Sequence, residues 1–249
     1  MEQTGGAAVQ PDKAMPSGRR RNRVIRLKNK ALRTAALAAA AVLGVLILIC
    51  AGALARLSVR GAALRIDLSS VYGNEKYRTP VWAEGVDVIT QDVSCGYAVI
   101  EMFSRWNGGT LTEEDLYLEY GKVVTSTGKA FCAEMNKRFP EYSTEMRSWL
   151  TDAELIDAVY DSLSGGKPVP VEWAALYGND WTLHYSLVVG MDIPNDKVTA
   201  ANPYGYTEEV SVAEFLNRTR FDAYEHMPLF LKLGFVFGIF EKNTVFPVR

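Results

Sequence analysis

Three residues whose side chains can cooperate in nucleophilic catalysis stand out along this chain: Cys95, His184 and Asn202. A thiolate attacks carbonyl carbon, an imidazole accepts and returns the proton, and an amide oxygen can orient the imidazole. Ser94, directly before the cysteine, is a good helix N-cap, so Cys95 is expected in the first turn of a helix. The positive end of the helix dipole favours a thiolate there, which predicts a lowered pKa for Cys95.

The neighbours of these residues add to the pattern. Gln91, four residues before the cysteine, carries an amide that can donate a hydrogen bond to the oxyanion of a tetrahedral intermediate. His184 opens an apolar predicted strand, and Asn202 follows the next predicted strand along the chain. A turn at 191–196 joins the two strands, so both side chains are expected at one end of a hairpin. Taken singly, each residue has an ordinary structural explanation: a buried thiol, a satisfied histidine and an Asn-Pro turn.

Helices come first and strands second in the region that must position these residues. Apolar spacing and capping residues predict helices at 95–106, 112–120, 129–138 and 151–163. Alternating β-branched and aromatic residues predict strands at 168–173, 184–189, 197–201 and 229–240, with a short extended segment at 85–89. The 229–240 segment is about twelve residues long and contains Lys232, so we expect a buried strand rather than a membrane span. The fold class is therefore α+β, with a helical half packed on an antiparallel sheet.

An uncharged stretch of 21 residues, Ala35 to Ala55, is long enough for a helix that spans the ~30 Å hydrocarbon core of a bilayer. Residues 1–55 hold nine Lys or Arg against two acidic residues, whereas residues 56–249 hold eighteen against twenty-seven. Basic flanks stay in the cytoplasm, which predicts a cytoplasmic N-terminus and an extracytoplasmic C-terminal region in the cell membrane. The alternative is secretion after cleavage of a signal peptide at Ala-x-Ala sites within 51–55. The length of the apolar stretch favours a retained anchor.

This pattern divides the chain into four parts. We expect a basic, disordered segment at 1–34, the transmembrane helix at 35–55, a juxtamembrane stalk at 56–80 and a globular domain at 81–249. The domain is too acidic to favour nucleic-acid binding, which needs a basic surface. Three cysteines exclude a four-cysteine zinc site, two histidines leave few other metal ligands, and no organic cofactor is implied. The expected partners are a peptide or protein substrate and the membrane.

Read in order, four segments resemble the papain-like cysteine peptidases: Gln91-x-x-x-Cys95-Gly96-x-Ala98, a Gly-Lys-Pro-Val run near 165–169, His184-Tyr-Ser-Leu-Val-Val-Gly190 and Asn202-Pro203-Tyr204-Gly205. The pattern is most similar to the branch of bacteriocin-leader (double-glycine) peptidases and their stand-alone relatives, over about residues 81–225. The resemblance implies a papain-like fold and hydrolysis of peptide bonds. It assigns Cys95 as nucleophile, His184 as base, Asn202 as orienting residue and Gln91 to the oxyanion site. Relatives usually carry Asp in place of Asn202, and often Pro in place of Tyr97.

Two other functions use the same residues. An acyl or peptidyl transferase would resolve the thioester with an amine instead of water, and a non-catalytic papain-like module would use the fold for binding alone. Leader processing beside a transporter is not expected, because the domain is predicted outside the cytoplasm and the sequence has no ATP-binding Gly-rich loop. Cys132 is expected to be a buried free thiol, although outside the cytoplasm it can pair with Cys95. His226 is the weaker alternative to His184 as base.

Overall fold

A computed structural model describes residues 17–64, 66–121 and 127–249, with side chains of the first helix described from residue 29. By its internal contacts the chain forms two units, Met1–Gly52 and Ala53–Arg249. Helix α1 (Ser17–Ala63) contains one segment, Asn29–Ala63, that is long and apolar enough to cross a membrane. A single helix of this kind near the N-terminus fits a signal sequence as well as a membrane span. Residues 17–34 are helical rather than disordered, and residues 1–16 lie outside the described part.

The second unit is built on an antiparallel sheet with strand order β5-β4-β3-β2-β6, and β1 pairs with β3. The strands are β1 (Val81–Trp82), β2 (Val169–Tyr177), β3 (Asp180–Asp192), β4 (Lys197–Asn202), β5 (Tyr206–Val210) and β6 (Thr244–Val245). Strands β2 and β3 form a long hairpin, and the predicted turn after Met191 joins β3 to β4. The order of helices and antiparallel strands confirms the expected α+β class.

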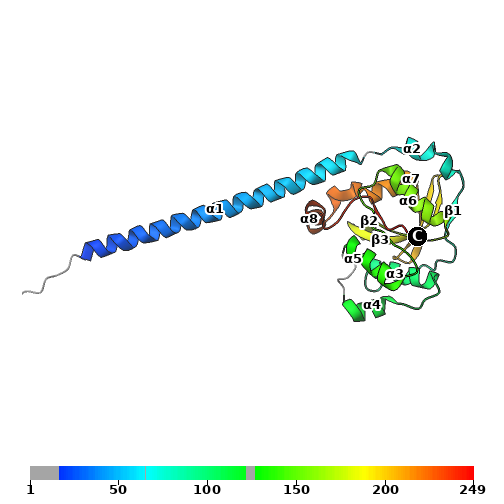
Figure 1. The fold of residues 1–249 in the computed structure, drawn as a ribbon, viewed down its shortest axis with the longest axis horizontal. Helices are drawn as coiled ribbons and strands as arrows, with labels where there is room; N and C mark the ends of the chain where they lie inside the picture. The colour runs from blue at the N-terminus through cyan, green and yellow to red at the C-terminus, as the bar shows by residue number, and fades with distance from the viewer. Residues whose placement is uncertain (1–16, 65, 122–126) are drawn as a thin grey trace, which may run out of the picture. The chain divides into compact units, whose positions relative to one another are not determined.

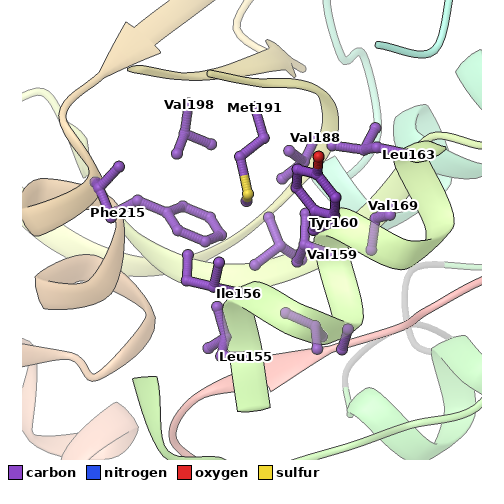
Figure 2. Close-up of a cluster of buried hydrophobic side chains, with 14 of the residues drawn as sticks. Leu155, Ile156, Val159, Tyr160, Leu163, Val169, Val188, Met191, Val198 and Phe215 are labelled. Carbon is purple, nitrogen blue, oxygen red and sulfur yellow. The ribbon is translucent and has the colours of Figure 1, made fainter. Parts of the chain in front are cut away.

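Helices cover both faces of this sheet (Figure 1). One face packs against α3 (Cys95–Trp106), α4 (Glu113–Tyr120) and α5 (Gly128–Arg138), and the other against α6 (Asp152–Ser164) and α7 (Val212–Thr219). Alternation along β3 divides its side chains: Tyr185 and Leu187 join the α3 cluster, whereas Val188 joins the α6 cluster. Figure 2 shows the α6 cluster, in which side chains from two helices and two strands converge: Ile156, Val159, Met191, Val198 and Phe215.

Local capping explains where the helices begin. Ser94 accepts a hydrogen bond from the Tyr97 N–H and starts α3, as expected. Thr112 and Thr151 each form a reciprocal capping box with the acidic residue three positions on, at the starts of α4 and α6. The remaining short helices are α2 (Leu68–Tyr72), η1 (Glu75–Arg78), η2 (Asp222–His226) and α8 (Leu229–Phe237).

The structure differs from the sequence-based expectations at three places. Helix α8 (Leu229–Phe237) occupies most of the segment 229–240 that was expected to be a buried strand, and the left-handed Gly238 ends it. Residues 85–89 form no strand; the adjacent Thr90 makes a single bridge to Tyr204. The segment expected to be a stalk, 56–80, packs into the domain, because Val71 and Tyr77 are core residues beside α6.

Candidate active site

Cys95 is the first residue of α3 and is half-buried, whereas the residues that follow it in the helix, from Gly96 to Ser104, are buried. The backbone N–H groups of Tyr185 and Gly96 lie close enough to its sulfur to favour the thiolate. Tyr185 directly follows His184 along β3. The packing of α3 on β3 therefore places the thiol at the peptide that joins the histidine to its neighbour.

His184 is 1% exposed and lies within β3, opposite Trp173 of β2, rather than at the strand end expected from the sequence. Its Nε2 lies 2.9 Å from Oδ1 of Asn202, the last residue of β4. Because the amide oxygen accepts, Nε2 carries the proton, and Nδ1 is the nitrogen available to exchange a proton with a thiol. The predicted hairpin thus brings the histidine and the asparagine together.

The amide of Asn202 is itself held in place. Its Nδ2 donates to Oε2 of Glu208 at 2.7 Å, and its Oδ1 also accepts from the Tyr204 N–H at 2.9 Å. Arg218 of α7 binds Oε1 of Glu208 at 2.7 Å and stacks over the Trp173 ring at 4.8 Å. A partly buried chain of polar contacts therefore runs from the imidazole to the guanidinium and fixes which amide atom faces His184.

Tyr204 covers the imidazole. Its ring stacks on His184 with centroids 4.3 Å apart and an interplanar angle of 27°. Burial and the nearby Cys95 sulfur both raise the pKa of Tyr204, so this ring lies close to the cysteine as well. Gly205 has a φ of +89°, and a Cβ there would collide with Thr90, so the turn needs glycine. The tyrosine shields the His184–Asn202 hydrogen bond from water.

Gln91 reaches the same place from the segment before α3. Its backbone N–H donates to the Pro203 carbonyl at 2.7 Å, which ties it to the turn that carries Tyr204. Its Oε1 is buried and has no hydrogen-bond partner among the described residues. A groove of about 590 Å³ opens beside it, lined by residues of that segment, the β2–β3 hairpin tip and the turn after β4, among them Gln91, Tyr177 and Tyr204.

Burial sets the protonation of the cysteine and the histidine. Desolvation, with a smaller effect of Glu172, raises the pKa of Cys95 to about 11. Desolvation also lowers the pKa of His184 to about 4, although the hydrogen bond that Nε2–H donates to Asn202 opposes this shift. The expected lowered pKa of Cys95 is therefore wrong for this state, because desolvation outweighs the helix terminus and the backbone N–H groups. The resting pair is a neutral thiol and a neutral imidazole.

Glu113 anchors the segment between Gln91 and the cysteine. Its buried carboxylate accepts from the backbone N–H groups of Asp92 at 2.6 Å and Ser94 at 3.0 Å. The N–H of Glu113 in turn donates to the buried Glu101 carboxylate at 2.7 Å. Sequence reasoning missed the roles of Glu113, Glu208 and Tyr204; of these, only Tyr204 stood inside a recognised motif.

The other two candidates, Cys132 and His226, make no hydrogen bond to Cys95, His184 or Asn202 in the described part of the chain. Cys132 and Cys95 are both free, and the Cys132 sulfur lies 3.4 Å from the Thr144 carbonyl oxygen. His226 is exposed in η2, and in the described part of the chain no hydrogen bond or ring contact joins it to the site. The same described residues hold no group of three His, Cys, Asp or Glu side chains suited to a metal ion.

A family model described as the Peptidase_C39 like family matches residues 83–227, which is more than half of the chain and includes the four residues predicted from the sequence. No curated protein matches the chain.

Proposed function

The chain belongs to the Peptidase_C39-like family, and from this premise we propose that it is a membrane-anchored cysteine peptidase with Cys95 as nucleophile. The observation that carries the proposal is the hydrogen bond of His184 to Asn202, whose Nε2 and Oδ1 atoms lie 2.9 Å apart. The backbone N–H of the next residue, Tyr185, faces the Cys95 sulfur. This is the arrangement that a thiol, its base and an orienting amide need.

The first half of the reaction follows from the neutral resting pair. A peptide lies in the groove beside Gln91 and Tyr204, and the sulfur of Cys95 attacks its carbonyl carbon while the thiol proton moves to Nδ1 of His184. The imidazolium is stabilised because Nε2–H donates to Asn202. The side-chain amide of Gln91 and the backbone N–H groups at the start of α3 donate to the oxyanion.

The second half restores the enzyme. Collapse of the tetrahedral intermediate breaks the C–N bond, and the proton on Nδ1 goes to the departing amine. Water attacks the resulting thioester on Cys95 while His184 accepts a proton from it. The C–S bond then breaks, the carboxylic acid leaves, and Nδ1 returns its proton to the sulfur. An amine in place of water would give the transferase outcome through the same thioester. Water is the simpler acceptor, and we assign hydrolysis.

We propose that the apolar residues 35–55 anchor the protein in the cell membrane, with the peptidase domain outside the cytoplasm. The support is the length of the uncharged stretch, the helix Asn29–Ala63 that contains it, and the excess of basic residues before it.

A mixed peptide library tests the activity. The detergent-solubilised full chain is incubated with the library, and cleaved peptides are identified by mass spectrometry. Cys95→Ala should abolish cleavage, and His184→Ala should lower it by 10³-fold or more, on the order of the loss seen for catalytic dyads. Cys132→Ser is the matched control and should cleave normally. Equal cleavage by the wild type and Cys95→Ala would refute the proposal. Ligated peptides in the presence of added glycinamide would identify a transferase.

A further inference from the structure

Helix α8 exposes an apolar face that the fold leaves uncovered. Leu229 is 71% exposed and Phe230 is 69% exposed, and three more large apolar side chains in the same segment are exposed: Leu233, Phe237 and Ile239. Positions 229, 230, 233 and 237 follow helical spacing, so they share one face of α8. Contiguous exposed apolar surface of this kind marks a site of association with a partner or a membrane.

The opposite face holds α8 firmly on the domain. Leu231 and Phe235 are buried in a cluster with Phe221 and Met227. The rings of Phe221 and Phe235 have centroids 4.7 Å apart. The inward face of α8 is therefore already packed against the domain. The outward face belongs to the same fixed helix and is a second, separate apolar surface.

The residues that directly follow the uncharged stretch contact α8. Leu57 packs against the same cluster as Phe235, and the Arg56 guanidinium lies against Gly238 at the end of the helix. Arg56 is the first charged residue after 35–55, so an inserted stretch would place it at the level of the lipid headgroups. These contacts lie within the unit Ala53–Arg249, so α8 lies beside the first residues that follow the uncharged stretch.

Basic side chains beside the apolar face of α8 suit a lipid surface, while the neighbouring η2 adds the exposed acidic residues Asp222 and Glu225. The exposed residues that follow the uncharged stretch, Arg56 and Arg60, are basic, and segment 229–240 carries a single charge, that of Lys232. Basic side chains at the edge of an apolar helix face pair with lipid phosphates while the apolar face enters the boundary between headgroups and acyl chains. The proposed anchor at 35–55 would itself bring the bilayer next to Arg56, whereas a second protein would need a separate binding site there.

We propose that α8 is an interfacial helix: its exposed apolar face docks into the outer leaflet of the membrane that residues 35–55 cross. This inference rests on the proposed membrane anchoring and is independent of the catalytic assignment. Docking gives the domain a second attachment beside the point where the chain emerges, and so restricts its rotation on the membrane. The depth expected for such a helix is about 5–10 Å.

The test measures where α8 lies in the full chain. Cys50, Cys95 and Cys132 are changed to Ser, and one new cysteine is introduced as Phe230→Cys or Leu229→Cys and labelled with the fluorophore NBD. Leu118→Cys on α4 is the matched control, since Leu118 is a 75% exposed apolar residue on another helix. The proteins are reconstituted into vesicles of phosphatidylcholine and phosphatidylglycerol. Flotation of the vesicles reports anchoring, and nitroxide-labelled lipid or aqueous iodide quenches the probe.

We expect both α8 probes to be quenched several-fold more by nitroxide lipid than the Leu118 probe, and correspondingly less by iodide. If the protein floats but the α8 probes respond to iodide as the Leu118 probe does, the docking is wrong and the anchoring stands. If the protein floats, the NBD probes on α8 resist both quenchers, and the same cysteine left unlabelled cross-links two copies, then a second copy covers the face and the docking is wrong. A protein that does not float would overturn the anchoring together with the docking.

Discussion

Nδ2 of Asn202 lies 2.7 Å from a carboxylate oxygen of Glu208, so the amide presents its oxygen, and not its nitrogen, to His184. An asparagine alone has no strong preference between its two rotated forms, and Glu208 supplies one because a carboxylate only accepts. Glu208 touches neither the thiol nor the imidazole in any described contact. We therefore regard it as a positioning residue that acts through Asn202.

Exchange of the amide at 202 and the carboxylate at 208 tests whether Glu208 positions residue 202. Asn202→Asp should lower kcat by at least tenfold, because the new carboxylate faces Glu208 and the two like charges repel. Glu208→Gln should recover activity in the Asn202→Asp background, since its amide donates to the new carboxylate. The measurement is kcat and KM for one identified peptide across pH.

A change in KM with kcat unaltered would contradict a positioning role for Glu208. So would an Asn202→Asp, Glu208→Gln double variant that is no more active than Asn202→Asp. Glu209→Gln is the control, because Glu209 is a neighbouring glutamate on β5 that pairs with the exposed Lys197 and not with Asn202.

The neutral resting pair predicts an unusual alkylation profile for Cys95. With the pKa of Cys95 near 11 and that of His184 near 4, the thiol stays protonated throughout the neutral range. The rate of labelling by iodoacetamide should therefore rise about tenfold per pH unit from pH 6 to pH 9, without a plateau. The measurement uses the full chain with Cys50→Ser and Cys132→Ser, so that one thiol reacts, and glutathione as the reference thiol.

A labelling rate already constant from pH 5 upward would instead reveal a thiolate paired with an imidazolium, and the assignment of a neutral pair would be wrong. His184→Ala separates the cases further, because it removes the plateau of an ion pair but leaves the slope of a neutral thiol.

Topology is tested on intact cells. Protease added outside should digest the domain at 81–249 and spare the basic segment that contains Arg19–Arg33, because the excess of basic residues keeps the N-terminus in the cytoplasm. An N-terminal epitope should become accessible to antibody only after permeabilisation. Protection of the domain with exposure of the epitope would show the reverse orientation. A mature chain that begins near residue 56 would show a cleaved signal.

Local sequence signals predicted much of the scaffold. Caps such as Ser94 and Thr151 lie within three residues of the N–H groups they bind, so the starts of α3 and α6 could be read from the sequence. The hairpin of β3 and β4 was likewise visible from alternation and turn residues. Helix α8 was missed because LFLKLGFVFGIF is apolar on every face, which hides the helical period that its exposed side reveals in the structure.

The site depends on contacts that sequence spacing does not encode. Glu113 binds the backbone of Ser94 nineteen residues earlier, and it belongs to an acidic run that reads as an ordinary helix start. Glu208 is one of two adjacent glutamates on β5, and strand pairing decides which of them faces Asn202. The pKa of Cys95 has the same origin: the helix terminus was visible in the sequence, whereas the desolvation that outweighs it comes from tertiary packing.

Glu172 predicts a pH-dependent stability. It lies fully buried in β2, and neither carboxylate oxygen has a hydrogen-bond partner among the described residues. Burial, with a smaller effect of Glu241, raises its pKa from 4.5 to about 8. The folded state therefore holds a proton that the unfolded chain releases above pH 4.5. Stability from this group is complete below pH 4.5 and is lost progressively as the pH rises to about 8.

Glu172→Gln removes the ionisation and keeps the shape of the side chain. At pH 4 the variant should be as stable as the wild type. Its advantage in free energy of unfolding should grow from pH 5 to pH 8 and stay constant above pH 8. Because each unit of pKa shift is worth about 1.4 kcal/mol, that advantage should reach several kcal/mol. Thermal unfolding of the detergent-solubilised full chain at pH 4, 6 and 9 measures the difference. Glu84→Gln, at an exposed glutamate, is the matched control for the loss of one carboxyl group. A difference for Glu172→Gln that stays the same at all three pH values would mean that the carboxyl is not kept neutral by burial.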